Sequence, residues 1–319
     1  MIQKESIIRD TLLYSSANYI AIFVSFFVSI FSKRFLGVSG AGYWAILTVV
    51  LTYGMYVGLG IKKGLVREVS QSIGAKEIEK AKNIEDATFS YLIVASLAGG
   101  VIIWILSFFF VGEVIFRNGM KIIAVLVLIT HLYNLILIIL RARKQFLILS
   151  KVVVFNTLFI ALFALPGAYL FNVNGFAAGM VVATSLSFYF GKKWANIKFS
   201  FNLDWVQIWN LIKIGFAMIL VGMLFRTFLN IDRIMIGKML GVEQLGLYTI
   251  GLMAVHQVGS LPRFFSIVIF PHIQEKYGAT KNVMDVKGMI LKPTYFISRL
   301  MPIFLGIIIF LIQPIVLYA

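Results

Sequence analysis

The stretch Val152–Gly191, VVVFNTLFIALFALPGAYLFNVNGFAAGMVVATSLSFYFG, contains no charged residue. A single helix of this length would extend roughly 60 Å, about twice the hydrocarbon thickness of a bilayer. The chain must therefore fold back, and Asn172-Val173-Asn174-Gly175 in the middle has the composition of a turn. The stretch predicts two membrane-spanning helices joined by a tight hairpin.

The composition of the whole chain extends this prediction. Of the 319 residues, 60% are apolar and 13% are charged, and the mean hydropathy is +0.94. A soluble domain of this length could not bury so much apolar surface. The absence of cysteine excludes disulfides, thiolate metal sites and cysteine nucleophiles. The short polar stretch 1–10 lacks a signal-peptide cleavage site and is interpreted as a cytoplasmic leader.

Uncharged runs predict an all-α polytopic membrane protein with about nine transmembrane helices. Besides the two arms of the hairpin, the expected spans are 11–32, 41–60, 87–112, 122–140, 214–231, 245–270 and 293–318. In residues 194–213, an interfacial helix is expected to lie on the inner membrane surface, because Trp205, Ile208, Trp209 and Ile212 share one helical face.

The distribution of basic residues predicts the orientation. With the N-terminus inside, three arginines fall within spans, and the outer segments hold only Lys33, Arg34, Arg117, Lys121, Arg233 and Lys238. The rest of the 29 lysines and arginines fall on the inner side. This is the pattern of a protein of the cytoplasmic membrane whose N-terminus lies in the cytoplasm. Anionic lipid on that side accounts for the net charge of +16, so no nucleic-acid partner is expected.

An internal repeat predicts two lobes. Residues 36–46 (LGVSGAGYWAI) match 240–250 (LGVEQLGLYTI) at an offset of 204, and the same offset places Gly74-Ala75 on Gly278-Ala279. Six helices separate equivalent helices, so the repeats are expected to run parallel in the membrane. We expect a six-helix lobe at 1–191, a linker at 192–213 and an incomplete second lobe at 214–319. Twelve helices would complete two such lobes, so the chain is expected to be a partial sequence.

A polar stripe follows the first predicted helix. It includes Asn18, Ser25 and Ser29, with Thr11, Ser15 and Ser32 on the same side. Small polar residues of this kind either hydrogen-bond to neighbouring helices or line a water-filled cavity. The length of the stripe favours the cavity, with the stripe binding substrate.

Three arginines lie inside predicted spans and no acid lies deep in any of them. Arg226 shares a helical face with Asn230, while Arg263 and Arg299 lie towards the inner ends of their helices. Arg263 and Arg299 are explained equally well by snorkelling. A charge in the bilayer requires compensation, so these arginines indicate an anionic substrate. Asp232 and His256 are the candidates for ion or proton coupling, although Asp232 more simply pairs with Arg233.

Two segments resemble the bacterial polysaccharide (O-antigen-type) flippases. The first is RFLG at 34–37 followed by GY at 42–43 and GLVRE at 64–68, and the second is NIDRIMIGKMLG at 230–241 followed by LGLY at 245–248. This family belongs to the multidrug/oligosaccharidyl-lipid/polysaccharide exporter superfamily. The resemblance implies about twelve helices in two lobes around a central cavity, with alternating access by rocking of the lobes.

The resemblance also implies a function. It is the flipping of an undecaprenyl-diphosphate-linked oligosaccharide from the inner to the outer leaflet, for surface polysaccharides such as O-antigen and lipopolysaccharide, with polysaccharide assembly proteins as partners. Alternatives are a multidrug or ion-coupled exporter of the same superfamily and a membrane polymerase or glycosyltransferase. The last is disfavoured because no outer loop is long enough for a catalytic site. No nucleotide-binding loop, metal-ligand cluster or nucleophile–base spacing is present, so we expect neither an enzyme nor a cofactor.

Overall fold

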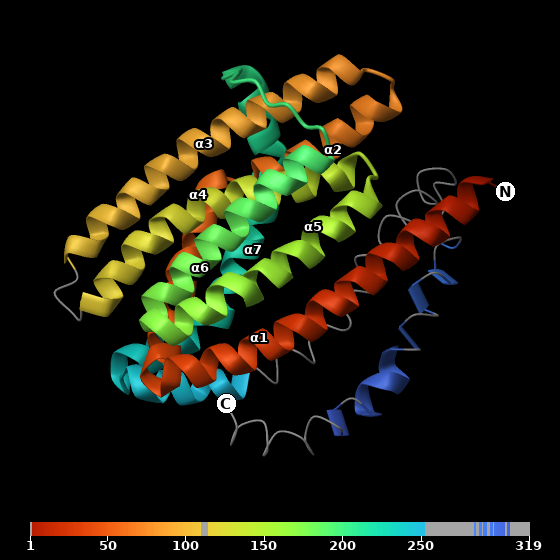
Figure 1. Cartoon of the computed structure of the whole chain (residues 1–319). Helices are drawn as coiled ribbons and strands as arrows, with labels where there is room; N and C mark the ends of the chain where they lie inside the picture. Colours follow the sequence, from red (N-terminus) through yellow and green to blue (C-terminus); the bar gives the residue numbers. More distant parts are fainter. Residues whose placement is uncertain are drawn as a thin grey trace.

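The computed structural model describes residues 2–109, 114–252 and individual positions between 284 and 306. All regular elements within this part of the chain are helices, and residues 242–252 add a further helical segment. The elements are α1 (Ile2–Gly54), η1 (Met55–Gly58), α2 (Ile61–Gly74), α3 (Ile78–Phe109), α4 (Val114–Ala142), α5 (Phe146–Phe159), η2 (Ile160–Ala164), α6 (Leu165–Trp194) and α7 (Trp205–Met239). Figure 1 shows α3, α4, α6 and α5 packed side by side with α1 next to α5, whereas α7 packs mainly against α2.

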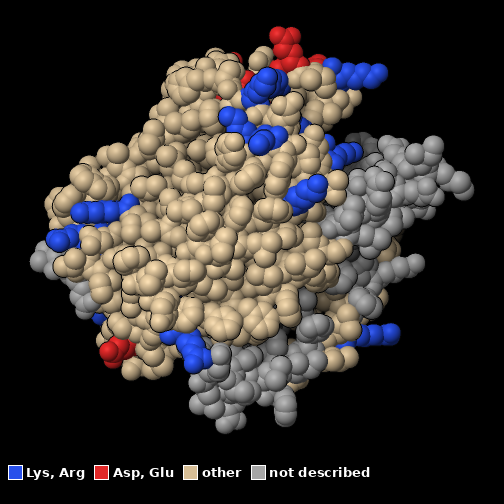
Figure 2. All heavy atoms as spheres, viewed as in Figure 1, with Lys and Arg blue, Asp and Glu red and all other residues tan. Residues whose placement is uncertain are grey.

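Five helical stretches are long and apolar enough to cross a membrane. They are Ser16–Gly58, Ile78–Phe109, Val114–Ala142, Phe146–Trp194 and Trp205–Met239. On the face shown in Figure 2, lysine and arginine atoms lie towards the edges and the broad middle is free of charge. The predicted all-α polytopic membrane fold is therefore confirmed. Most of the predicted spans at 245–270 and 293–318 lie outside the described residues.

The two longest stretches each contain a break where the sequence predicts a connection. Gly37 divides α1 with φ 66° and ψ 179°, between the predicted spans 11–32 and 41–60. Asn172 divides α6 with φ 54°, and its side-chain oxygen accepts a hydrogen bond from the Val173 amide at 2.8 Å. Asparagine tolerates a positive φ because its short side chain bonds to the nearby backbone. The predicted hairpin with its turn at Asn172 is confirmed.

Small residues bring the two arms of the hairpin into backbone contact. A Cβ atom on Gly175 would lie 2.0 Å from the Gly167 carbonyl oxygen, and one on Gly179 would lie 2.4 Å from the Phe163 carbonyl oxygen. Within a membrane, helices associate through such close packing because lipid is as apolar as the side chains. The glycines thus allow the forty uncharged residues to pack as a helix pair.

One helix was not predicted. α2 follows the turn at Gly60 and buries Ile61, Leu65 and Val69, which lie on one face at intervals of four residues. Because its other face carries lysines and arginines, α2 is not part of an uncharged run and was not among the predicted spans. Its apolar spacing is nevertheless typical of an amphipathic helix.

The prediction of a separate interfacial helix before the seventh span is wrong. Residues 205–213 form the first turns of α7, which continues without a break to Met239. Ile208 and Ile212 are buried, whereas Trp205 and Trp209 are exposed. α7 remains continuous because the sequence between Asn210 and Gly215 contains no proline or turn signal.

The two ends of the bundle have separate apolar cores. The first core includes Leu65 of α2, Leu140 of α4 and Leu211 of α7, and we call this the α2 end. The second core includes Leu36, Tyr43 and Val173, close to the breaks in α1 and α6, and we call this the Gly37 end. α7 runs from the α2 end towards the Gly37 end and therefore passes the whole length of the bundle.

Candidate substrate site

Arg226 lies within the membrane-spanning length of α7 and its side chain is exposed. Two tyrosines from the preceding helices reach α7 on either side of it. The Tyr53 hydroxyl donates a hydrogen bond to Thr227 Oγ1 at 3.1 Å, and the Tyr56 hydroxyl donates to the Gly222 carbonyl at 3.4 Å. Tyr56 also lies within electrostatic range of the guanidinium group. The two tyrosine hydroxyls therefore contact α7 within about one turn of Arg226.

The charge of Arg226 is not balanced by an acid in the described part of the chain. The ion pairs found there join Arg67 to Glu68, Lys80 to Glu77, Lys82 to Asp86 and Arg143 to Glu85. A guanidinium group presents a planar fork of donors that fits a carboxylate or a phosphate. The surroundings of Arg226 thus suit an anionic ligand that also carries hydroxyl groups.

The structure separates Arg226 from the other predicted residues of α7. Asn230, one turn further along, is buried with 6% of its surface exposed. Asp232 is half-buried, and its carboxylate accepts hydrogen bonds from the Arg233 amide at 2.7 Å and from the Tyr248 hydroxyl. These contacts occupy Asp232 locally. Its role in ion coupling stays a prediction.

The polar stripe on the first half of α1 is partly open. Ser25 is exposed, while Asn18 and Ser29 are half-buried. Ser32 is buried and donates a hydrogen bond to the Ser29 carbonyl at 3.0 Å, within the same helix. The exposure of Ser25 is compatible with the water-filled cavity, which stays a prediction.

The remaining predicted residues belong to the part of the chain with few described positions. Arg299 is exposed within a helical stretch at 297–303. Arg263 and His256 lie outside the described residues. The three arginines are therefore not brought together by the described structure, and their joint role stays a prediction.

Comparison with known proteins identifies the family. A family model for polysaccharide biosynthesis proteins matches residues 33–317. The chain belongs to the polysaccharide biosynthesis protein family. No curated protein sequence matches the chain.

Solved structures of transporters share the fold of this family member. The chain is similar to an inward-facing multidrug resistance MATE family transporter of the MOP superfamily, with TM-score 0.61, 15% identity and coverage of 92% of this chain and 72% of that chain. It is also similar to a MATE protein in complex with Br-NRF, with TM-score 0.60, 16% identity and coverage of 92% and 74%. An outward-facing MATE family transporter matches with TM-score 0.57, 16% identity and coverage of 98% and 79%. These likenesses show that the polysaccharide biosynthesis protein has the MOP transporter fold.

Sequence reasoning missed the tyrosines beside Arg226. Tyr53 and Tyr56 lie three residues apart near the end of the predicted second span, where aromatic residues at a membrane interface are common. Only the contact of α7 with η1 and the end of α1 shows that their hydroxyls reach Thr227 and Gly222. The i, i+3 spacing of two tyrosines was the available signal, because it places both hydroxyls on one helical face.

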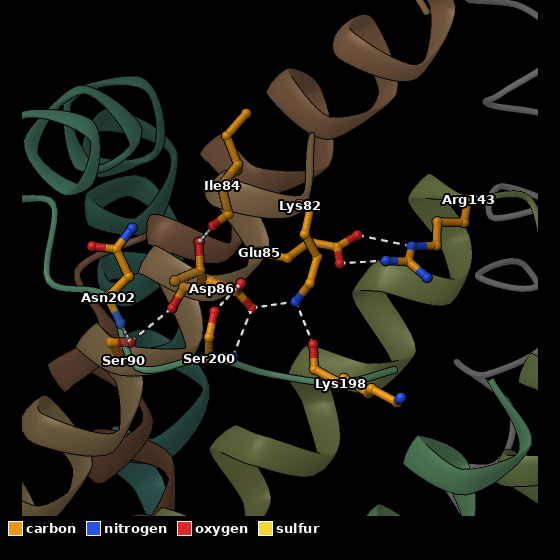
Figure 3. A network of polar contacts seen from close by, with 10 residues as sticks. Lys82, Ile84, Glu85, Asp86, Ser90, Arg143, Lys198, Ser200 and Asn202 are labelled. Carbon is orange, nitrogen blue, oxygen red and sulfur yellow. Dashed lines mark hydrogen bonds and ion pairs between the residues drawn. The ribbon is translucent and has the colours of Figure 1, made fainter. Parts of the chain in front are cut away.

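The densest described polar network lies away from Arg226, at the α2 end (Figure 3). Glu85 accepts two hydrogen bonds from Arg143, at 2.8 and 2.5 Å, and is fully buried. Asp86 pairs with Lys82 at 2.5 Å and accepts a hydrogen bond from the Ser200 hydroxyl at 2.5 Å. α3 begins at Ile78, before the predicted third span at Ala87, and these partners allow both acids to be buried in its first turns.

A cavity of about 310 Å³ also lies at the α2 end. It is bordered by α2, α3 and the start of α7, and its polar lining residues are Glu68, Lys80, Asp204, Gln207 and Asn210. Acids and bases are mixed in this lining, so it does not select an anion. Of the two places, the surroundings of Arg226 are the better candidate for substrate binding.

Proposed function

We propose that this polysaccharide biosynthesis protein flips an undecaprenyl-diphosphate-linked oligosaccharide from the inner to the outer leaflet of the cytoplasmic membrane. The observation that carries the proposal is Arg226, an exposed cation in a membrane-spanning helix with no acidic partner among the described residues. A charge at this depth costs at least about 2.5–3.5 kcal/mol, so its presence requires a compensating function. A diphosphate supplies that compensation.

The groups around Arg226 match the rest of such a substrate. The hydroxyls of Tyr53, Tyr56 and Thr227 can exchange hydrogen bonds with sugar hydroxyls. The exposed and half-buried polar residues of α1 extend the polar surface available to a glycan. The polyprenyl tail needs no polar site, because it remains in the bilayer while the head group crosses.

The orientation and the path complete the proposal. The basic residues of α2 and the linker support a cytoplasmic position for the α2 end under the positive-inside rule. Arg263 and Arg299 would meet the diphosphate nearer the cytoplasmic side and Arg226 nearer the outer side. Transport then passes the diphosphate from the first pair to Arg226 while two lobes, 1–191 and the part after 213, rock against each other. Polysaccharide assembly proteins would supply and remove the glycan.

The test replaces Arg226 in a strain whose surface polysaccharide depends on this protein. Arg226→Lys keeps the charge but loses the bidentate fork, so partial glycan display is expected. Arg226→Gln removes the charge and should reduce display roughly tenfold or more, the effect of losing charged hydrogen bonds. Lys238→Gln is the matched control, because Lys238 is an exposed basic residue at the end of the same helix.

The outcomes separate the alternatives. Protein levels in the membrane are matched by immunoblotting before display is compared. Normal display in the Arg226→Gln variant would overturn the role of Arg226. If the same variant instead became sensitive to cationic drugs with normal display, the multidrug alternative would replace the proposal.

A further inference from the structure

The two copies of the internal repeat meet at the Gly37 end through equivalent residues. With the offset of 204, Val38 corresponds to Val242 and Gly42 corresponds to Gly246. A Cβ atom on Gly42 would lie 2.0 Å from the Val242 carbonyl oxygen, and one on Gly246 would lie 2.0 Å from the Val38 carbonyl oxygen. Each glycine therefore contacts the carbonyl of the valine in the other repeat. Such a reciprocal contact is what a two-fold relation between two similar units produces.

Only glycine permits this contact. Any other residue at position 42 or 246 would place a side-chain carbon at 2.0 Å from a backbone oxygen, far inside van der Waals distance. Backbone cannot move aside as the end of a flexible side chain can. Leu245 next to Gly246 is fully buried, and Val242 packs on the apolar core that contains Leu36 and Tyr43. Gly42 and Gly246 are themselves buried, so the two backbones are in direct contact at this junction.

One hydrogen bond reinforces the junction. Lys33 Nζ of α1 donates to the Thr249 carbonyl oxygen at 2.8 Å, across 216 residues of sequence. Thr249 itself is buried, with 8% of its surface exposed, and its hydroxyl donates to the Gly246 carbonyl at 2.9 Å. Lys33 therefore connects the first repeat to the same turn of helix that carries the second glycine.

We propose that Gly42, Gly246 and Lys33 form a seal at the Gly37 end that opens to release the transported head group. This rests on the proposed function for the identity of the cargo, although the seal itself is a property of the chain alone. Backbone atoms in contact leave no space for a sugar between the repeats. A hydrophilic head group that leaves at this end must therefore separate Gly42 from Val242 and Gly246 from Val38, and must break the Lys33 bond.

The seal predicts the behaviour of a buried reporter. The chain contains no cysteine, so Thr249→Cys introduces a single thiol that is covered while the seal is closed. A membrane-impermeant maleimide added outside intact cells should label it slowly. Gly42→Ala, in the other repeat, prevents closure and should make labelling several times faster. Gly246→Ala should have a similar effect because the two contacts are equivalent.

Two further variants make the experiment decisive. Gly251→Ala is the matched control, because a Cβ atom at Gly251 would meet no atom within 4 Å, and its labelling should equal that of the parent. Lys33→Met removes the hydrogen bond without adding bulk and should accelerate labelling to a smaller extent. If either glycine variant fails to accumulate, Lys33→Met carries the test.

The result that overturns the seal is labelling of Gly42→Ala, or in its absence Lys33→Met, at the rate of the Gly251→Ala control. This result is independent of the glycan assay. If Gly42→Ala speeds labelling and the Arg226→Gln variant displays glycan normally, the seal is supported and the proposed cargo site is rejected. If Gly42→Ala leaves labelling at the control rate and the Arg226→Gln variant loses display, the cargo site is supported and the seal is rejected.

Discussion

At the α2 end the segment leading into α7 is held by buried charges, whereas at the Gly37 end the repeats meet through glycines and one lysine. At the α2 end, Asp86 binds Ser200 of the linker, and Phe89 stacks on Phe199 with ring centroids 4.3 Å apart. The linker amide of Asn202 donates to Ser90 Oγ at 2.7 Å. At the Gly37 end, the side-chain bond from Lys33 to the Thr249 carbonyl links the repeats.

This difference assigns different roles to the two ends. A buried ion pair is expensive to break, because one partner is left charged and desolvated. When a glycine separates from a backbone carbonyl, no charged side chain is left desolvated without its partner. The α2 end therefore suits a permanent joint, and the Gly37 end suits a junction that opens and closes. The close approach of Gly60 to Gly215 makes the α2 joint tight as well as polar.

The largest effect is expected at the buried ion pair of the α2 end. Glu85→Gln leaves the guanidinium of Arg143 without its carboxylate and should lower the free energy of unfolding by about 3–5 kcal/mol. The measurement is the thermal unfolding of purified protein in detergent together with its yield. Glu77→Gln, which affects an exposed ion pair of α3 with Lys80, is the control and should have little effect. Equal midpoints for the two variants would show that this buried pair does not stabilise the α2 end.

A smaller effect is expected at the glycine contact of the same joint. Gly215→Ala would place a Cβ atom 2.0 Å from the Gly60 carbonyl oxygen, so α7 must move away from α2. Such overpacking typically costs about 1–3 kcal/mol. Gly222→Ala in the same helix meets no atom within 4 Å, so its gain in helix propensity should leave it neutral or slightly stabilised. The comparison of the two unfolding midpoints checks the contact.

The contrast with Gly246→Ala sharpens the comparison further. Gly215 and Gly246 make equally short contacts, yet only the first is expected to belong to a joint that never opens. Gly215→Ala should therefore reduce stability, while Gly246→Ala should mainly increase the labelling of Thr249→Cys. If both substitutions reduced stability without a change in labelling, the two ends would not differ in role.

The sequence predicted the features that depend on neighbouring residues. Charge-free runs identify spans because unpaired charges are excluded from hydrocarbon, and Asn172 marks its turn through a local hydrogen bond. The repeat also aligned Val38 with Val242 and Gly42 with Gly246, which the structure places in reciprocal contact. An alignment of equivalent residues in two repeats gives no distance between them, so the sequence does not predict this contact.

The features missed depend on partners far along the chain. The burial of Glu85 could not be predicted, because its partner Arg143 is 58 residues away in the sequence. Arg226 was found from its position in an apolar helix, but Tyr53 and Tyr56 were not, since their contacts require α7 to pack on the end of α1. Local patterns give the spans and the unusual residues, and packing decides which of them meet.

A pH-dependent effect is expected from Lys62, which lies in α2 between the membrane spans. Its ammonium group contacts His131 Nδ1 at 3.0 Å, and burial lowers the pKa of Lys62 to about 8. The unfolded chain has a lysine pKa of about 10.4, so between about pH 8 and 10.4 the unfolded state binds more protons. The free energy of unfolding should therefore increase with pH in this range. Below about pH 8, Lys62 is charged in the folded state, and the burial of this charge lowers the free energy of unfolding by its full amount.

The measurement compares slopes, because several other lysines titrate in the same range. Lys62→Met should flatten the rise of the unfolding midpoint between pH 8 and 10.4. Lys63→Met changes an exposed neighbour on the same helix and should keep the parent slope. The absolute midpoint is less informative, since loss of the ammonium group also removes its contact with Nδ1 of the buried His131. A slope retained in Lys62→Met would contradict the buried charge.

The smallest effect is expected at Asp204, where the linker joins α7. Its carboxylate accepts a hydrogen bond from the Gln207 amide at 3.0 Å and caps the helix at an exposed position. Asp204→Ala removes the cap and should lower the free energy of unfolding by about 1 kcal/mol, whereas Asp204→Ser keeps an acceptor and should lie close to the parent. If the α2 end is held by its buried network, the loss of this cap should leave the linker attached, and trypsin should cut at Lys198 no faster than in the parent. Cleavage as fast as in an Asp86→Asn variant would show that the exposed cap holds the linker as firmly as the buried carboxylate does.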